Sequence, residues 1–160
     1  MRFPNSTETS RWKVELSESA IHRSLVMALV GWIAATHLRG DINLVLVDGA
    51  ISPLTKRPPV VNGYVPDVVV PRALSGRFII GEAKTRNDLE SKHTVAQLEA
   101  FVCGCQRHAG SLFVLAVPWD VTVLARHLVE TIVEEAGLPR VETKVVDPRV
   151  EVQRGGVLNA

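Results

Sequence analysis

The sequence predicts an α/β protein whose mixed sheet is flanked by helices. Three segments carry apolar residues at helical spacing, and short runs rich in β-branched residues lie between them. Three of these strand-like runs precede the second helical segment and fit an antiparallel meander, whereas the later crossover helix permits a parallel pairing. A chain of 160 residues, 46% of them hydrophobic, is long enough and apolar enough to bury one core.

The boundaries of the elements follow from capping and breaking residues. Ser17 is a suitable N-cap and Gly40 a suitable stop for the first helix, while Pro71 and Pro118 end strands. Prolines and glycine make a loop of 52–63. We therefore expect helices at 17–38, 94–107 and 121–136, and strands at 42–47, 64–70, 77–84, 111–117 and 141–146.

The expected domain organisation is simple. Residues 1–16 read as a flexible N-terminal arm, 17–147 as a single domain, and 148–160 as a flexible C-terminal tail, because the last segment is polar and contains glycine. No apolar run reaches the length of a transmembrane helix, and the polar N-terminus lacks the apolar core of a signal peptide. We expect a cytoplasmic protein without a membrane partner.

Charged residues interrupt two of the apolar strands. Glu82 and Lys84 end the strand that begins at Arg77, and side chains two apart in a strand project to the same side. Asp67 lies within the preceding apolar strand, where a lone carboxylate is costly unless it is paired or binds a cation. If the two strands are hairpin neighbours, Asp67 approaches Glu82, and a divalent ion such as Mg²⁺ would relieve their repulsion.

The same spacing also fits a simpler interpretation. Glu82 and Lys84 can form an ordinary ion pair at a strand end, and Asp67 can face water at a strand edge. The formal net charge of +1 does not favour either interpretation, because only a strongly basic chain would have indicated a nucleic-acid partner.

The segment Pro66-Asp67, followed after fourteen residues by Glu82-Ala83-Lys84, resembles the signature of the PD-(D/E)XK nuclease superfamily, which includes restriction endonucleases and Holliday-junction resolvases. The core of that family is α-β-β-β-α-β, with the aspartate on the second strand and the E-x-K on the third. The elements expected here have the same order, so the resemblance covers roughly residues 17–117. It implies a restriction endonuclease-like core within 17–147.

Two more positions match the family pattern. Many members carry a glutamate on the first helix, as Glu18 does here, and a glutamine early in the helix after the third strand, as Gln97 does. Glu18 is equally suited as a first-turn acid that favours the helix dipole, and Gln97 as a solvated helix residue. His22 lies one turn after Glu18 and can face the same pocket, although a packed or solvated histidine is the commoner case.

The resemblance implies roles for these residues. Asp67, Glu82 and the backbone carbonyl of Ala83 would hold Mg²⁺, for which Mn²⁺ would substitute, with Glu18 assisting directly or through water. Lys84 would position the attacking water and stabilise negative charge on the phosphate, and Gln97 would orient Lys84 or a phosphate.

The expected function is therefore metal-dependent hydrolysis of DNA phosphodiester bonds by an endonuclease, which we expect to act as a homodimer. Four basic residues near the motif are candidates for contact with DNA phosphates, or else ordinary surface charges: Lys56, Arg57, Arg86 and Lys92. The alternative is a noncatalytic nuclease-fold binding or scaffold subunit of a larger nucleic-acid-processing assembly. A partner protein that supplies target recognition is compatible with either function.

Overall fold

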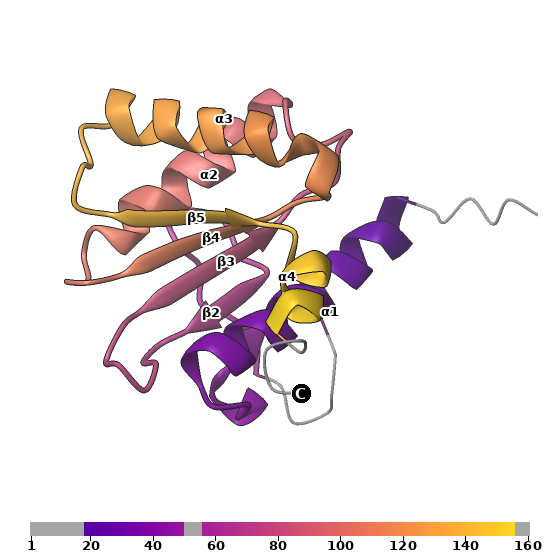
Figure 1. The fold of residues 1–160 in the computed structure, drawn as a ribbon. Helices are drawn as coiled ribbons and strands as arrows, with labels where there is room; N and C mark the ends of the chain where they lie inside the picture. The colour runs from indigo at the N-terminus through magenta and orange to yellow at the C-terminus, as the bar shows by residue number, and fades with distance from the viewer. Residues whose placement is uncertain (1–17, 50–55, 156–160) are drawn as a thin grey trace, which may run out of the picture.

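The computed structural model describes residues 18–49 and 56–155 (Figure 1). The N-terminal arm expected at 1–16 lies outside the described residues. The helices are α1 Glu18–His37, α2 Lys92–Cys105, α3 Thr122–Glu135 and α4 Pro148–Gly155, with short 3-10 helices η1 Ile42–Leu44 and η2 Trp119–Val121. The strands are β1 Leu46–Val47, β2 Val68–Val70, β3 Ile79–Ala83, β4 Leu112–Ala116 and β5 Glu142–Val146.

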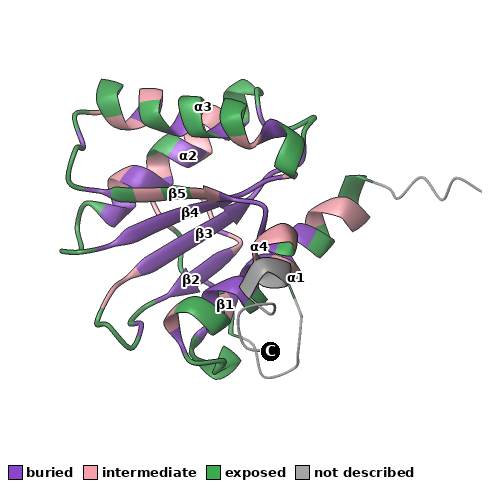
Figure 2. Ribbon diagram, in the orientation of Figure 1, coloured by how far each residue is buried: buried purple, intermediate pink, exposed green. Residues whose placement is uncertain are grey.

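The strands form one mixed sheet in the order β1-β2-β3-β4-β5. The strands β1, β2 and β3 pair antiparallel, whereas β4 runs parallel to β3 and β5 runs parallel to β4. The predicted α/β class and the mixed sheet are confirmed. All five residues of β3 are buried, which matches its apolar sequence and its central place in the sheet (Figure 2).

Helices cover both faces of this sheet. Leu25, Leu29 and Ile33 of α1 are completely buried in a core with inward-facing residues of β2, β3 and β4, and α4 packs beside α1. On the other face, Leu98 and Phe101 of α2 share a core with residues of α3 and of the same strands. The end of β3 consequently lies between a helix of one layer and a helix of the other.

Helix α1 is long and apolar enough to meet the criterion for a membrane-crossing helix by length and composition alone. This differs from the expectation that no segment would do so. Leu25, Leu29 and Ile33 are fully buried against the sheet, so core packing accounts for the apolar character of the helix.

Three elements differ from the expected boundaries by more than two residues. The Asp41 side chain accepts the Asn43 N–H and starts η1, so only Leu46–Val47 remain as a strand where 42–47 was expected. The second strand begins at Val68, which places Asp67 just before it. Where a fraying tail was expected from 148, residues Pro148–Gly155 form α4.

Helix α4 is held at its start and along its length. The carboxylate of Asp147 accepts the backbone N–H of Arg149 at 3.0 Å, which orders the first turn. Further along, the Glu151 carboxylate accepts the Trp32 indole N–H of α1 at 2.9 Å. These two contacts explain why a polar segment is nevertheless helical.

Candidate functional site

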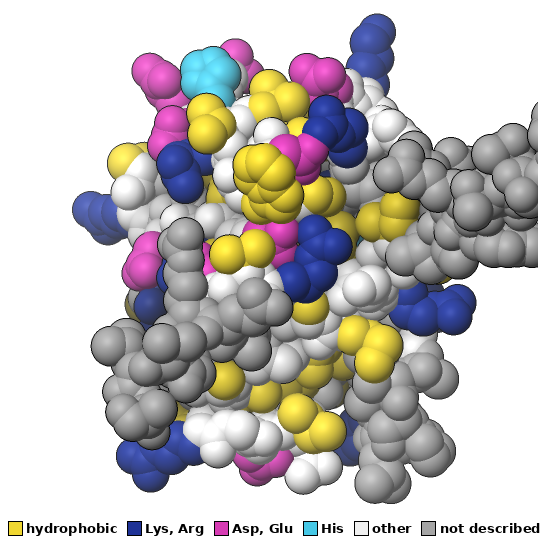
Figure 3. Space-filling model, turned by 45° about the vertical axis from the view of Figure 1, so that its right-hand side comes forward, with side chains coloured by type: hydrophobic (Ala, Val, Ile, Leu, Met, Phe, Trp, Pro, Cys, Tyr) yellow, Lys and Arg dark blue, Asp and Glu magenta, His cyan; other side chains and the backbone are white. Residues whose placement is uncertain are grey.

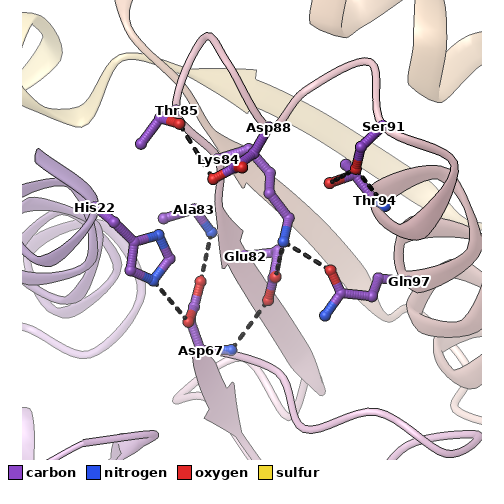
Figure 4. A network of polar contacts seen from close by, with 10 residues as sticks. All are labelled: His22, Asp67, Glu82, Ala83, Lys84, Thr85, Asp88, Ser91, Thr94 and Gln97. Atoms are coloured by element: carbon purple, nitrogen blue, oxygen red, sulfur yellow. Dashed lines mark hydrogen bonds and ion pairs between the residues drawn. The ribbon is translucent and has the colours of Figure 1, made fainter. Parts of the chain in front are cut away.

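Polar side chains gather where β3 ends (Figure 4). Glu82 and Lys84 lie on the side of β3 that also carries Ile80, as the alternation of a strand requires, and this side faces α2. Glu82 is only 3% exposed, and Lys84 is also buried. Two ionisable groups are therefore placed where burial makes their charges expensive unless they are compensated.

Asp67 and Glu82 are brought together by the antiparallel pairing of β2 and β3. Val68 is paired with Gly81, so Asp67 stands opposite Glu82. The Asp67 N–H donates to Glu82 Oε2 at 3.1 Å, and the Ala83 N–H donates to Asp67 Oδ2 at 2.8 Å. Both carboxylates are thus oriented by backbone groups of the facing strand, and the expected approach of Asp67 to Glu82 is confirmed.

Lys84 connects Glu82 to helix α2. Its ammonium lies 2.9 Å from Glu82 Oε1 and donates to Gln97 Oε1 at 2.7 Å. An ammonium has three donors, so one remains after these two contacts. The structure therefore places Gln97 directly on Lys84, as expected for a residue that orients it.

His22 approaches the site from the other helix layer. Its Nε2 lies 3.3 Å from Asp67 Oδ1, and the hydrogen bond to Asp67 raises the pKa of the imidazole above its usual value. The nearby carboxylates of Asp67 and Glu82 act in the same direction, whereas burial opposes them. The sequence pointed to this residue only through its position one turn after Glu18.

Burial and the charge of Asp67 together raise the pKa of Glu82 to about 7, while the neighbouring Lys84 opposes this shift. Such a pKa means that Lys84 offsets only part of the cost of burying a negative charge on Glu82 beside Asp67. Perturbed acids of this kind concentrate at functional sites, although structural networks also contain them.

The raised pKa predicts how stability depends on pH in metal-free buffer. The pKa of Glu82 in the folded protein lies above its value of about 4.3 in the unfolded chain, so protonated Glu82 favours the folded state. This contribution to the free energy of unfolding is complete below about pH 4.3 and is lost as the pH rises through about 7. The loss is on the order of a few kcal/mol. Glu82→Gln removes it, so chemical denaturation from pH 4.5 to 8 in EDTA should show a flatter profile than wild type.

His22 also makes the protein less stable as the pH rises, because its pKa in the folded protein is raised as well. The informative quantity is therefore the difference between wild type and Glu82→Gln. Glu90→Gln, which changes an exposed acid outside the site, is the matched control. Parallel profiles for wild type and Glu82→Gln would contradict the assigned ionisation of Glu82.

Glu18 lies at the first turn of α1 but contacts the loop that follows β3. Its carboxylate accepts hydrogen bonds from the Thr85 hydroxyl and, at 3.1 Å, from the Asn87 side chain. Among the described residues, no contact joins Glu18 to Asp67 or Glu82. Thr85 and Asn87 were not expected from the sequence, since nothing in their local pattern links them to a residue almost seventy positions away.

A cavity of about 820 Å³ opens beside the site, between the first half of α1 and the end of β1. Glu18, His22, Asp48 and Asp88 line it, together with Arg23. A ligand that reached Asp67 from this cavity would pass His22. The charge of the lining is mixed and mainly acidic, which favours a cation or a metal-bound anion over a free anion.

Two of the four basic residues expected to contact DNA are paired with carboxylates. Arg57 pairs with Asp48 at 3.2 Å, and Arg86 pairs with Asp120. Lys56 follows the segment 50–55, which lies outside the described residues, and Lys92 begins α2 at the surface. Two of the four charges are therefore already balanced by a neighbouring carboxylate.

Asp67 and Glu82 form a pair of carboxylates that could hold a metal. Across residues 18–49 and 56–155, no group of three or more His, Cys, Asp and Glu side chains is arranged to hold a metal ion. Mg²⁺ is commonly bound by one or two carboxylates, with water and phosphate oxygens completing its shell. Asp67 and Glu82 fit this pattern, and a cation would offset the repulsion that raises the pKa of Glu82.

Comparison of the chain with protein-family models, with curated proteins and with solved structures finds no match.

Proposed function

We propose that this chain is a metal-dependent nuclease with a restriction endonuclease-like core, related to the PD-(D/E)XK superfamily. The observation that carries the proposal is the meeting of Asp67, Glu82 and Lys84 at the end of β3. The order α1, β1, β2, β3, α2, β4 agrees with the α-β-β-β-α-β core, with Asp67 next to β2 and Glu82 on β3. The substrate we propose is a DNA phosphodiester.

Asp67 and Glu82 would hold Mg²⁺ or Mn²⁺, with the backbone carbonyl of Ala83 as a further oxygen ligand. Each carboxylate oxygen has two lone pairs, so oxygens that already accept one hydrogen bond can still bind a cation. The metal supplies charge neutralisation for the anionic transition state of phosphoryl hydrolysis. The backbone N–H groups of Asp67 and Ala83 keep the two carboxylates in place.

Lys84 is the proposed catalytic residue besides the two carboxylates. Glu82 and Gln97 fix its ammonium from two sides, so its remaining donor has a defined direction. In that position it would bind the attacking water or a phosphate oxygen and stabilise the negative charge that develops there. Gln97 acts through Lys84 and is therefore a positioning residue.

His22 and Glu18 are proposed to position other groups. His22 contacts Asp67 Oδ1 and so restricts how that carboxylate can turn. Glu18 holds the Thr85–Asn87 segment, which directly follows Lys84, and any assistance to the metal would come through water.

The direct experiment is a cleavage assay with the purified chain. Supercoiled plasmid, branched duplex, single-stranded DNA and RNA are incubated with Mg²⁺, Mn²⁺ or EDTA. We expect cleaved DNA with either metal and none with EDTA. Binding of DNA without cleavage under all conditions would instead support the noncatalytic subunit, and absence of both would contradict the proposal.

The homodimer, a partner protein for target recognition and the cytoplasmic location stay predictions. Sedimentation velocity of the purified chain tests the first of them.

A further inference from the structure

A tryptophan is exposed at the same edge of the sheet as the candidate site. Trp119 is 70% exposed, and Val123, four residues later, is 75% exposed. Figure 3 brings forward the right-hand side of Figure 1, where β3 and β4 end, and hydrophobic side chains lie there at the surface beside charged ones. A group of large apolar side chains at the surface indicates a binding site, whereas single ones are common on any protein.

Trp119 is linked to Lys84 through the pairing of β3 with β4. The Lys84 N–H donates to the Ala116 carbonyl at 2.9 Å, and Trp119 follows Ala116 by three residues. The three residues from Ala116 to Trp119 span at most about 10 Å, which is the length of roughly three steps of a stacked nucleic-acid strand. Arg86, two residues after Lys84, pairs with Asp120 and so ties the loop after β3 to η2.

The backbone of Trp119 is fixed on both sides. Its N–H donates to the Asp147 carboxylate at 2.9 Å, and its carbonyl accepts the Thr122 hydroxyl at 2.8 Å. Asp147 is itself held by the Arg149 guanidinium at 3.0 Å. Several polar contacts therefore hold the backbone of Trp119 in place, while its indole stays in solvent. A ligand that binds the indole then loses less free energy in ordering this residue.

Two arginines lie near Trp119 in the fold. Arg86 pairs with Asp120 but has five N–H donors, so the ion pair leaves donors for a phosphate. Arg126 lines a cavity of about 240 Å³ together with Trp119, and Asp147 and Glu151 line it too; Asp147 is paired with Arg149, and Glu151 accepts the Trp32 indole N–H. An exposed aromatic ring with guanidinium groups nearby is a combination that binds unpaired nucleotides, because bases stack on the ring and phosphates pair with the cations.

We propose that Trp119, Arg86 and Arg126 form a platform for unpaired bases of the strand that enters the candidate site. The preferred substrate is then a single-stranded or forked nucleic acid, an inference that rests on the proposed nuclease function. In a blunt duplex every base is paired, and only the outer faces of the two terminal pairs are unstacked, so the duplex offers no unpaired base to the indole. A second copy of the chain is the competing occupant, but a stable interface buries about 800 Å² per partner, and the exposed apolar side chains here are only Trp119, Val123 and Leu124 of η2 and the start of α3.

The test measures binding in Ca²⁺, which keeps the substrate intact. Fluorescently labelled single-stranded DNA, its RNA counterpart, a forked duplex and a blunt duplex are titrated with wild type, Trp119→Ala and Trp119→Phe. Trp119→Ala should weaken binding of forked and single-stranded substrates about tenfold or more and leave the blunt duplex unchanged. Trp119→Phe should retain most of the affinity, and it should lose the quenching of tryptophan fluorescence that the wild-type complex shows.

Leu74→Ala, which removes an exposed apolar side chain from the turn between β2 and β3, is the matched control and should bind as wild type. Equal affinities of wild type and Trp119→Ala for forked DNA would overturn the platform, as would an equal loss for the blunt duplex. So would dissociation of a dimer by Trp119→Ala in sedimentation without any change in binding. If Trp119→Ala still cleaves with metal and keeps the substrate preference of wild type, the platform is rejected but the nuclease proposal stands. If binding depends on Trp119 but no substrate is cleaved, the nuclease proposal is rejected but the platform stands.

Discussion

Replacing Lys84 by alanine is expected to reduce metal-dependent cleavage by a factor of about 100 to 10,000, the range typical for removal of a group that acts on a proton or a developing charge. The ammonium lies 2.9 Å from Glu82 and 2.7 Å from Gln97, and alanine leaves both contacts and the remaining donor unmade. Nicking of plasmid and branched DNA in Mg²⁺ and Mn²⁺ measures the effect.

Two comparisons separate a catalytic from a structural role of Lys84. Metal binding should persist in Lys84→Ala, because the substitution removes a positive charge from beside a cation site. Lys144→Ala removes a lysine that is also paired with a glutamate, Glu151 at 3.7 Å, but lies on β5 outside the site, and it should cleave as wild type. Robust cleavage by folded Lys84→Ala would exclude the assigned role.

The second large effect concerns Asp67→Asn in metal-free buffer, which we expect to raise the melting temperature. The charge of Asp67 helps to raise the pKa of Glu82, so removing it relieves a repulsion inside a buried site. The asparagine oxygen can still accept the Ala83 N–H that Asp67 Oδ2 accepts at 2.8 Å. Thermal melts should be measured at pH 8.5, because less of His22 is protonated there and its attraction to Asp67 is weaker.

Added Mn²⁺ makes the same experiment specific for a metal site. Wild type should gain about 2.7 kcal/mol of stability at a Mn²⁺ concentration near one hundred times its dissociation constant, and Asp67→Asn should lose most of this gain. Asp41→Asn, which keeps the cap of η1, should respond to Mn²⁺ as wild type does. A destabilised Asp67→Asn variant, together with a wild type that does not respond to Mn²⁺, would contradict the nuclease proposal at its centre.

The sequence by itself determined which segments become helices and which become strands near the site. The apolar run before Glu82 is the buried central strand β3, and the two-residue spacing placed Glu82 and Lys84 on one side of it. The helical spacing of α1 and α2 likewise positioned Glu18 and Gln97 within a turn or two of their helix starts. These properties depend on neighbours within a few positions along the chain, which is why periodicity reveals them.

Only the tertiary structure decided which of these side chains meet. Asp67 reaches Glu82 because β2 pairs with β3 in one register, and His22 reaches Asp67 because α1 crosses the sheet beside that pair. The carboxylate of Glu18 instead accepts hydrogen bonds from Thr85 and Asn87. The carboxylate of Asp147 accepts the N–H groups of Arg149, at the start of α4, and of Trp119. These contacts join residues far apart in the chain, and their geometry comes from how the helices pack on the sheet, which no local spacing encodes.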